Sequence, residues 1–505
     1  MSFYVTTPIY YVNGEPHLGH AYTTIAADVL ARHMRQRGED VFFLTGTDEH
    51  GEPVALAAEK QGMTPRELAD KNAERFKAVS ALVNATNDFF IRTSDPRHVA
   101  KVQEVLQRVH DAGHVYKGVY EGFYCPRCAD FKSDSELIEG NKCPVHLLEL
   151  EREREENWFF RLSTFQEPLE RMFEERPDWV LPRNRYNEAL AFVKQGLNDV
   201  SLTRARITWG VPVPWDDGHV FYVWFDALLN YYTALSFARD GEDLTERFWP
   251  PTVHVMAKDI LKFHTVFWPA LLMAAGIELP RRDFIHGYLL MDEHKMSKSL
   301  GNVVDPFRIV ELYGADALRY YLLREVSFGQ DGSISTEGFE RRYTSELANE
   351  YGNLASRTLA MVAKYRDGVV PDAEAPAELA AAFADAPART IERFDAVELT
   401  AALEEIWGLV RRLNAFVQEE QPWQLAKDEA QAERLDSALY ALCEGLRVVS
   451  LLLLSFVPEA AAKLLGAIGQ DDLSLDAARF GSVGGGARCD PLEPLFPRVE
   501  ADAAA

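Results

Sequence analysis

Short apolar runs alternate with longer segments of helical periodicity over the first part of the chain. Residues 3–7 and 41–45 are mostly aromatic or β-branched, which is typical of buried strands. Between them, apolar side chains recur at helical spacing, at Ile25, Val29, Leu30 and Met34. This pattern predicts a helix that begins near Leu18 and ends before Gly38, because glycine is favoured just past a helix C-terminus.

The alternation of strands and helices continues beyond residue 60. Thr64-Pro65-Arg66-Glu67 is a capping box with proline at the first helical position, so a helix is expected to about residue 84. Residues 89–93 predict a strand, and Asp95-Pro96 begins another helix. Residues 286–290 are expected to form the last strand of the sheet. We therefore expect an α/β fold with a Rossmann-like, doubly wound parallel sheet. In such a sheet the loop 46–51 would lie at the carboxyl end of a strand, where ligands bind.

The second half of the chain is dominated by helical patterns. Residues 336–365, 388–418 and 424–456 are rich in Ala and Leu and poor in Gly and Pro, which favours an all-α helix bundle. The tail, 481–505, contains three consecutive glycines and is expected to be irregular. We expect six regions: the sheet domain in two halves (1–114 and 207–290), an insertion (115–206), a connecting region (291–335), the bundle (336–480) and the tail (481–505).

Four residues in the insertion have the spacing of a metal site. Cys125-Pro126-Arg127-Cys128 and Cys143-Pro144-Val145-His146 are two knuckles, and each can present two ligands from one turn. Four nitrogen and sulfur ligands satisfy tetrahedral zinc, so the set Cys125, Cys128, Cys143 and His146 predicts one structural zinc ion. A redox Cys-x-x-Cys motif is the alternative, but it leaves Cys143 and His146 unexplained. The charged run 149–156 is expected to be a solvated segment without a site.

Composition narrows the functional class. The 505 residues are 47% hydrophobic and 26% charged, which is typical of a globular protein of roughly three or four domains. We expect no membrane span and no secretory signal, because no apolar run is long enough and no basic-then-apolar N-terminus is present. A net charge of −25 argues against general polyanion binding but leaves room for a local basic track on RNA. Five cysteines fit a reducing cytoplasm.

The start of the first predicted helix is a candidate anion site. His17 and His20 lie three residues apart, on one side of the first helical turn, where backbone N–H groups and the helix dipole favour phosphate. Two histidines alone are weak evidence, because surface or capping histidines are commoner. A second stretch, Lys295-Met296-Ser297-Lys298-Ser299, changes the interpretation. Together the two resemble the HIGH and KMSKS signatures of class I aminoacyl-tRNA synthetases.

The fuller stretches PIYYVNGEPHLGHAYT and KMSKSLGNVVDP resemble the methionyl-tRNA synthetases in particular, of the bacterial type with one zinc knuckle pair. The resemblance extends from about residue 3 to about residue 460. It implies that 115–206 is a connective insertion with a zinc knuckle and that 291–335 is the KMSKS loop with a region that contacts the tRNA stem. It implies catalytic roles for His17, His20, Lys295 and Lys298. It also implies an ATP site at His17, Gly19, His20, Ala257, Asp259, Leu289 and Lys298. The family usually has glycine at the position of Ala257.

The resemblance implies a methionine site as well. Asp48 would meet the α-ammonium group, and the side-chain pocket would be formed by Pro8, Ile9, Tyr11, Trp224, Ala227, Leu228, Tyr231, Ile260 and His264. Aromatic walls suit a polarisable thioether. On the bundle, Asn353, Arg357 and Trp423 match the anticodon-reading positions, because an exposed Trp can stack on a base and Arg and Asn can bond base edges. From the residues alone, core packing of Trp423 and capping by Asn353 are equally good interpretations.

The implied reaction has two steps. The carboxylate of L-methionine attacks the α-phosphorus of ATP, held with Mg²⁺, and the 3′-terminal ribose hydroxyl of initiator or elongator tRNA(Met) then takes the aminoacyl group. Three alternatives remain: a sister synthetase for leucine, isoleucine, valine or cysteine, a nucleotidyltransferase that does not act on tRNA, and an inactive RNA-binding module. Nothing after the bundle resembles the family's dimerising appendix, so a monomer is expected.

Overall fold

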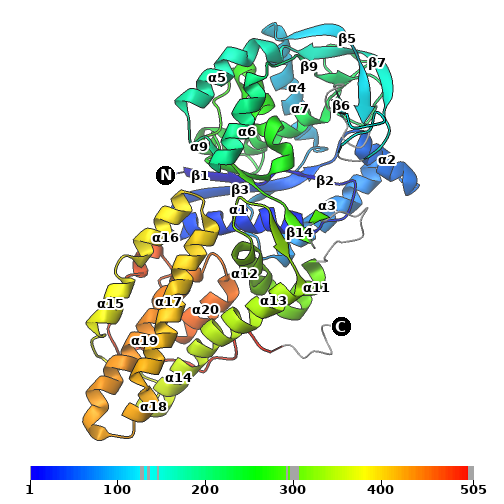
Figure 1. The fold of residues 1–505 in the computed structure, drawn as a ribbon. Helices are drawn as coiled ribbons and strands as arrows, with labels where there is room; N and C mark the ends of the chain where they lie inside the picture. The colour runs from blue at the N-terminus through cyan, green and yellow to red at the C-terminus, as the bar shows by residue number, and fades with distance from the viewer. Residues whose placement is uncertain are drawn as a thin grey trace.

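A computed structural model describes residues 2–125, 130–132, 137–144, 147–291, 294–295 and 306–498, with only the backbone of 130–132, 291 and 294–295 (Figure 1). Within these residues a seven-stranded sheet lies at the middle of the molecule. Its strands are β1 (Ser2–Thr6), β2 (Tyr10–Tyr11), β3 (Asp40–Asp48), β4 (Phe89–Arg92), β8 (Val180–Leu181), β12 (Val253–Ala257) and β13 (Asp283–His286). Every pairing among them is parallel.

The sheet order confirms the doubly wound arrangement. β1 lies between β3 and β12, β4 pairs with β3, and β13 and β8 follow β12. The chain therefore winds from β1 through β3 to β4 on one side and from β12 to β13 on the other. This reversal makes the carboxyl ends of β1 and β12 a topological switch point, the place where open α/β sheets bind ligands.

Alternating side chains of the strands supply two cores. In β1, Phe3 and Val5 join the core that includes helix α1 (Leu18–Gln36), whereas Tyr4 points to the opposite core. Phe43 and Phe42 divide in the same way in β3. This period of two is the geometry of a strand buried on both faces. The core on the α1 side continues into the helical region without a break.

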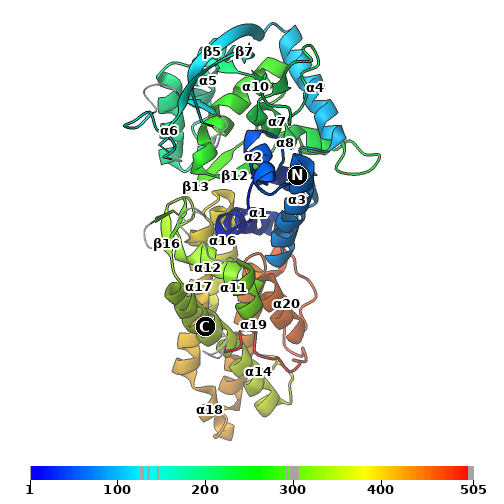
Figure 2. The same ribbon diagram turned by 90° about the vertical axis from the view of Figure 1, so that its right-hand side faces the viewer.

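The insertion forms the lobe above the sheet (Figures 1 and 2). Most of the charged run 149–156 belongs to β7 (Glu151–Phe160), which pairs antiparallel with β5 (Val115–Cys125), and most of its side chains are exposed, as expected. Glu155 of this strand is buried and accepts hydrogen bonds from two backbone N–H groups. The lobe also contains β6 (Asp130–Lys132), β9 (Val200–Ser201), α5 (Gln166–Glu175) and α6 (Arg183–Lys194).

Two strand boundaries differ from the sequence prediction. The strand predicted at 286–290 ends at His286, and β14 (Leu289–Met291) belongs to a separate sheet with β15 (His294–Lys295) and β16 (Gly332–Ile334). Gly287 permits this change of direction, since a Cβ there would lie 2.2 Å from the carbonyl carbon of Gln330. The predicted loop 46–51 begins as strand, because β3 continues to Asp48.

The helices around the sheet begin where the sequence indicates. α3 (Pro65–Leu82) has the predicted capping box at Thr64 and Glu67, and α4 (Pro96–Asp111) begins after the capping residue Asp95. The other α-helices of the sheet domain are α2 (Glu52–Lys60), α7 (Val223–Leu228), α8 (Asn230–Thr233), α9 (Thr245–Phe248) and α10 (Trp268–Ala275).

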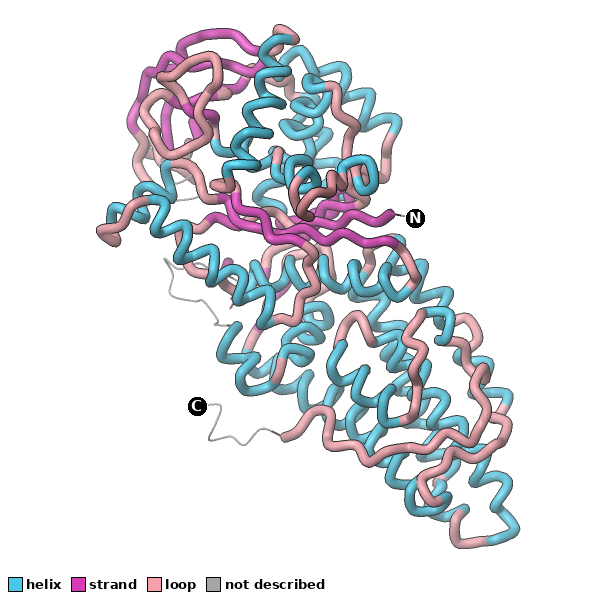
Figure 3. Tube along the Cα trace, turned by 180° about the vertical axis from the view of Figure 1, so that it is seen from behind, coloured by secondary structure: helices cyan, strands magenta, loops and turns pink. Residues whose placement is uncertain are grey.

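The helical region extends away from the sheet (Figure 3). Its elements are α11 (Pro306–Tyr313), α12 (Ala315–Glu325), α13 (Thr336–Arg342), α14 (Asn353–Arg366), α15 (Ala377–Phe383), α16 (Ala386–Asp395), α17 (Leu399–Glu420), α18 (Pro422–Leu425), α19 (Ala432–Leu453) and α20 (Pro458–Ala467). A π-helical segment, Tyr343–Gly352, joins α13 to α14. The predicted helix 388–418 is broken, because Val397 adopts a φ of 60° between α16 and α17. No helix of the described chain has the length and apolarity to cross a membrane.

Candidate active site

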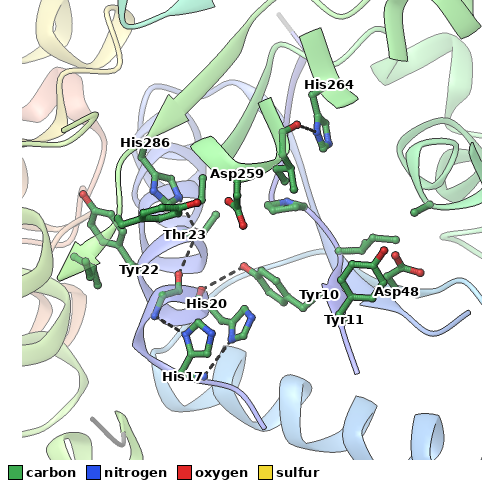
Figure 4. Close-up of a pocket in the computed structure, with 18 of the residues that line it drawn as sticks. Tyr10, Tyr11, His17, His20, Tyr22, Thr23, Asp48, Asp259, His264 and His286 are labelled. Carbon is green, nitrogen blue, oxygen red and sulfur yellow. Dashed lines mark hydrogen bonds between the residues drawn. The ribbon is translucent and has the colours of Figure 1, made fainter. Parts of the chain in front are cut away.

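A cavity of about 240 Å³ opens at the switch point, at the carboxyl ends of β1, β3, β12 and β13 (Figure 4). It is lined by all the predicted nucleotide and methionine residues whose side chains are described. These are Pro8, Ile9, Tyr11, His17, Gly19, His20, Asp48, Trp224, Ala227, Leu228, Tyr231, Ala257, Asp259, Ile260, His264 and Leu289. Lys298 lies outside the described residues, and of Lys295 only the backbone in β15 is described.

Two histidines form the helix start at one end of the cavity. His17 is the N-cap of α1, and its Nδ1 accepts from the backbone N–H of Gly19 at 3.1 Å. The Nδ1 of His20 accepts from the backbone N–H of His17, also at 3.1 Å, and the two rings stack 3.9 Å apart. Because each Nδ1 is an acceptor, the neutral rings carry their proton on Nε2. This end of the cavity therefore offers imidazole donors beside a helix N-terminus, as phosphate binding requires.

A buried carboxyl group stands at the opposite end of the cavity. Asp48 ends β3, is 2% exposed, and its Oδ1 has no hydrogen-bond partner among the described residues. Burial raises the pKa of Asp48 well above its usual value, and the negative charge of Asp226 raises it further. A cation that enters the cavity would restore the ionised form and supply the missing partner.

Between these ends the cavity wall is apolar and aromatic. Trp224 stacks on Phe263 with ring centroids 3.8 Å apart, and Ala227 and Leu228 follow on α7. One polar pair lies in this wall: the Tyr231 hydroxyl donates to His264 Nε2 at 2.8 Å, while His264 Nδ1 donates to the Ile260 carbonyl oxygen at 3.1 Å. Burial lowers the pKa of His264 to about 4, so the ring is neutral near pH 7. The wall suits an uncharged, polarisable side chain.

The cavity also contains residues that the sequence analysis did not single out, namely Tyr10, Tyr22, Thr23, His286, Gly287 and Tyr288. His286 ends β13, donates from Nδ1 to the Gly287 carbonyl oxygen, and accepts at Nε2 from Thr23, 2.8 Å away. Burial lowers the pKa of His286 to about 4. The signal in the sequence was its position in the last predicted strand, because the carboxyl ends of strands at the switch point face the ligand.

The other two predicted sites are described in part. Cys125 and Cys143, 18 positions apart in the sequence, are fully buried in one small cluster with Leu150. Cys128 and His146 lie outside the described residues, and the described residues alone form no group of metal ligands. On the helical region, the Arg357 guanidinium lies 5.6 Å from the ring centre of Trp423, and Asn353 is exposed one helical turn before Arg357. We call Asn353, Arg357 and Trp423 the Trp423 patch.

Comparisons with known proteins agree over almost the whole chain. The family described as "tRNA synthetases class I (M)" matches residues 3–155 and 148–359. The chain is 44% identical to the methionine–tRNA ligase of Caldanaerobacter subterraneus over 507 residues, covering 99% of this chain and 79% of that one. It is also 44% identical to the methionine–tRNA ligase of Streptomyces coelicolor, covering 100% and 98%.

A solved structure shares the fold. It is that of the Mycobacterium tuberculosis methionyl-tRNA synthetase in complex with methionyl-adenylate, which is 42% identical, with a TM-score of 0.94 over 98% of this chain and 100% of that one. These matches support the methionine enzyme and not a sister synthetase. This chain is therefore a member of the methionyl-tRNA synthetase family, the class I ligases that join methionine to tRNA.

Proposed function

We propose that, in the first step of the reaction, one end of the cavity binds methionine and the other end binds the phosphates of ATP. The observation that carries this proposal is that Asp48 adjoins an aromatic pocket at one end, as a buried carboxyl group whose Oδ1 has no hydrogen-bond partner within the described part of the chain. A helix start with two histidines stands at the other. Methionine carries an ammonium group beside a thioether chain, and ATP carries phosphates. The M. tuberculosis relative was solved with methionyl-adenylate, the product of joining these two substrates.

At the methionine end, Asp48 accepts hydrogen bonds from the ammonium group and the aromatic wall encloses the thioether. This leaves the substrate carboxylate directed toward the nucleotide. At the phosphate end, His17 and His20 donate from Nε2 to phosphate oxygens, and Asp259 accepts from ribose hydroxyls. Lys295 and Lys298 meet charge that develops on the pyrophosphate. Mg²⁺ would accompany ATP, whose phosphates would supply most of its ligands.

The chemistry needs no covalent nucleophile from the protein. The methionine carboxylate attacks the α-phosphorus, the bond to the bridging oxygen of the leaving pyrophosphate breaks, and methionyl-adenylate forms. The 3′-terminal ribose hydroxyl of tRNA(Met) then attacks the carbonyl carbon and releases AMP. The rate comes from positioning and from donors aimed at developing charge.

The Trp423 patch is proposed to read the anticodon. Arg357 holds the half-buried Trp423 ring by a cation–π contact, which leaves an aromatic face and a guanidinium edge near an exposed amide. Such a set stacks on one base and bonds the edges of its neighbours. We assign these roles to the regions predicted from sequence. Regions 1–114 and 207–290 activate methionine, region 336–480 selects the tRNA, and region 291–335 joins them.

We also propose one structural zinc ion in the insertion. Cys125 and Cys143 come together in one buried cluster, which fits a pair of thiolates shared between two knuckles. Cys128 and His146 would complete the set. Thiolate ligands need a reducing setting, which the cytoplasm provides. Elemental analysis should find one zinc per chain. Cys125→Ser should release it, whereas Cys443→Ser, at a buried cysteine of α19, should not.

Asp48→Asn tests the central proposal. The amide keeps the shape but cannot offer a negative charge to the ammonium group, so we expect methionine affinity to fall by about 2–3 kcal/mol, the scale of a charged hydrogen bond. ATP affinity should be unchanged. Isothermal titration of methionine and of ATP into the two proteins gives both values. Equal methionine affinity would overturn the assignment of Asp48.

A further inference from the structure

A second buried carboxylate lies directly behind the methionine wall. Asp226 is fully buried on α7, next to the pocket residue Ala227. Its Oδ2 accepts from His50 Nδ1 at 2.6 Å and its Oδ1 accepts from His98 Nε2 at 2.8 Å. The other ring nitrogen of His98 is 2.7 Å from Thr233 Oγ1. The carboxylate thus joins three separate segments: the end of β3, helix α4 and helix α7.

This carboxylate is coupled to Asp48 in two ways. His50 follows Asp48 by two residues, and its backbone N–H donates to the Asp48 carboxyl group while its ring donates to Asp226. In addition, the negative charge of Asp226 is, after burial, the largest influence that raises the pKa of Asp48. Two carboxylates in one buried region cannot both remain ionised without a compensating cation.

The neighbouring charges do not supply that cation. Glu49 accepts hydrogen bonds from Arg92 and Ser94. The positive charge of Arg92 is therefore paired with Glu49 and not with Asp48 or Asp226. Among the described residues, the ion-pair partners of Asp226 are only His50 and His98. Trp209, whose ring centroid lies 5.3 Å from that of His50, carries no charge. The Tyr11 ring meets Trp224 edge-on, with centroids 6.2 Å apart. The two histidine side chains that bond Asp226 are therefore the groups that offset its charge.

We propose that Asp226, held between His50 and His98, is a positioning residue that sets the charge state and orientation of Asp48 and thereby the pH range in which methionine binds. The proposal rests on the role assigned to Asp48 above. With the ammonium group absent, Asp226 disfavours the ionised form of Asp48. With methionine bound, the ammonium group balances Asp48, and the His50 main chain keeps its carboxyl group aimed into the pocket.

Methionine affinity measured from pH 4.5 to 7.5 by calorimetry tests this role. In the wild-type chain, methionine affinity should fall as the pH is lowered and Asp48 takes up a proton. We call this part of the curve of affinity against pH the acid limb. Asp226→Asn keeps the side-chain shape and removes the negative charge, so the midpoint of this acid limb should move down by about one pH unit. His50→Gln replaces the imidazole 2.6 Å from Asp226 with a weaker amide donor, which offsets the charge of Asp226 less, so the midpoint should move up.

A matched control separates charge from packing. Glu444→Gln removes another fully buried carboxylate, paired with Arg447 in α19 far along the chain, and should leave the acid limb where it is. An unchanged limb in Asp226→Asn, with any loss confined to thermal stability, would overturn the proposal, because Asp226 would then only hold α7. If that variant does not fold, an unchanged limb in His50→Gln overturns it equally.

The Asp48→Asn variant distinguishes a failure of the role of Asp48 from a failure of the inference about Asp226. If Asp48→Asn binds methionine normally, the proposed role of Asp48 fails and the Asp226 proposal fails with it. If Asp48→Asn loses affinity while both other variants keep the wild-type limb, the role of Asp48 stands and only the inference about Asp226 is wrong. Opposite shifts in Asp226→Asn and His50→Gln support both.

Discussion

The cavity and the Trp423 patch differ in how the fold holds their side chains. In the cavity, polar groups are buried and locked by partners on other strands or helices, as Tyr231 is by His264 and His286 is by Thr23. In the patch, Asn353 is exposed and Arg357 holds Trp423 by a cation–π contact across two helices of one region. A pre-formed cavity suits a small molecule, whereas an exposed patch suits bases that must splay out to be read.

The side chains of the cavity and those of the Trp423 patch therefore depend on the fold in different ways. A cavity residue depends on several strand ends at once, so disturbing the sheet should impair methionine activation. A patch residue depends only on α14 and α18, so changing it should affect tRNA alone. Residues that connect the sheet to the helical region should affect both activities.

Arg319 is such a connecting residue, and its loss should have the largest effect. The side chain is fully buried on α12, 2.7 Å from Asp28 of α1, and it donates to the carbonyl oxygens of Val83, Ser455 and Phe456. Arg319→Met leaves a buried carboxylate without its main partner, so unfolding free energy should fall by about 3–5 kcal/mol. Urea unfolding measures this, and both activities should fall together at elevated temperature.

The pH dependence of this effect has a definite sign. Burial alone would raise the pKa of Asp28, but Arg319 and Arg32 outweigh it and lower the pKa below the usual value. The pair therefore contributes stability above the unfolded pKa, about 3.9, and loses it as pH falls through the lower folded pKa. The difference between wild type and Arg319→Met should shrink below about pH 4. Arg412→Met, at a surface ion pair, should change stability by no more than about 0.5 kcal/mol.

The phosphate end should show the next largest effect. His20→Ala removes a donor to developing charge, so methionine-dependent pyrophosphate exchange should slow by about 2–4 kcal/mol. His20→Asn separates catalysis from capping, because its Oδ1 can still accept from the His17 N–H while the Nε2 donor is gone. The assignment is supported if both variants lose pyrophosphate exchange rate and only His20→Asn keeps the wild-type melting temperature. His33→Ala, near the other end of α1, should leave the rate unchanged.

The same two regions show what sequence could and could not predict. The strand and helix starts followed from capping residues and periodicity, and the family resemblance named sixteen described residues that line one cavity. The break at Val397 was missed, because an apolar residue at positive φ has no local signature and is held there by tertiary packing. The close approach of Gly287 to the backbone of Gln330, 43 residues later, is a tertiary contact that periodicity cannot reveal.

Trp423→Ala tests the patch against the cavity. Loss of one stacking face should weaken aminoacylation of a tRNA with a CAU anticodon by about 1–3 kcal/mol. Pyrophosphate exchange should be unchanged, because the cavity does not depend on this residue. Trp423→Phe should recover part of the loss. Trp407→Ala, at a fully buried Trp of α17 that donates to Glu350, is the contrast: it should lower stability and both activities. The same pattern in Trp423→Ala would make that ring a core residue.

Asn353→Ala should have the smallest effect and is the sharpest test of the comparison. The side chain is exposed at the first residue of α14, so truncation should cost little stability. If the amide bonds a base edge, charging of tRNA(Met) should fall by about 0.5–1.5 kcal/mol, the net worth of one hydrogen bond, through KM rather than kcat. Asn414→Ala is the matched control, since its amide donates to the carbonyl oxygens of Glu350 and Val410 within the bundle. It should lower the melting temperature without a selective effect on KM for tRNA. If Asn353→Ala instead melts early and charges normally, the exposed amide is stabilising the transition from π-helix to α-helix, and base reading rests on Arg357 and Trp423 alone.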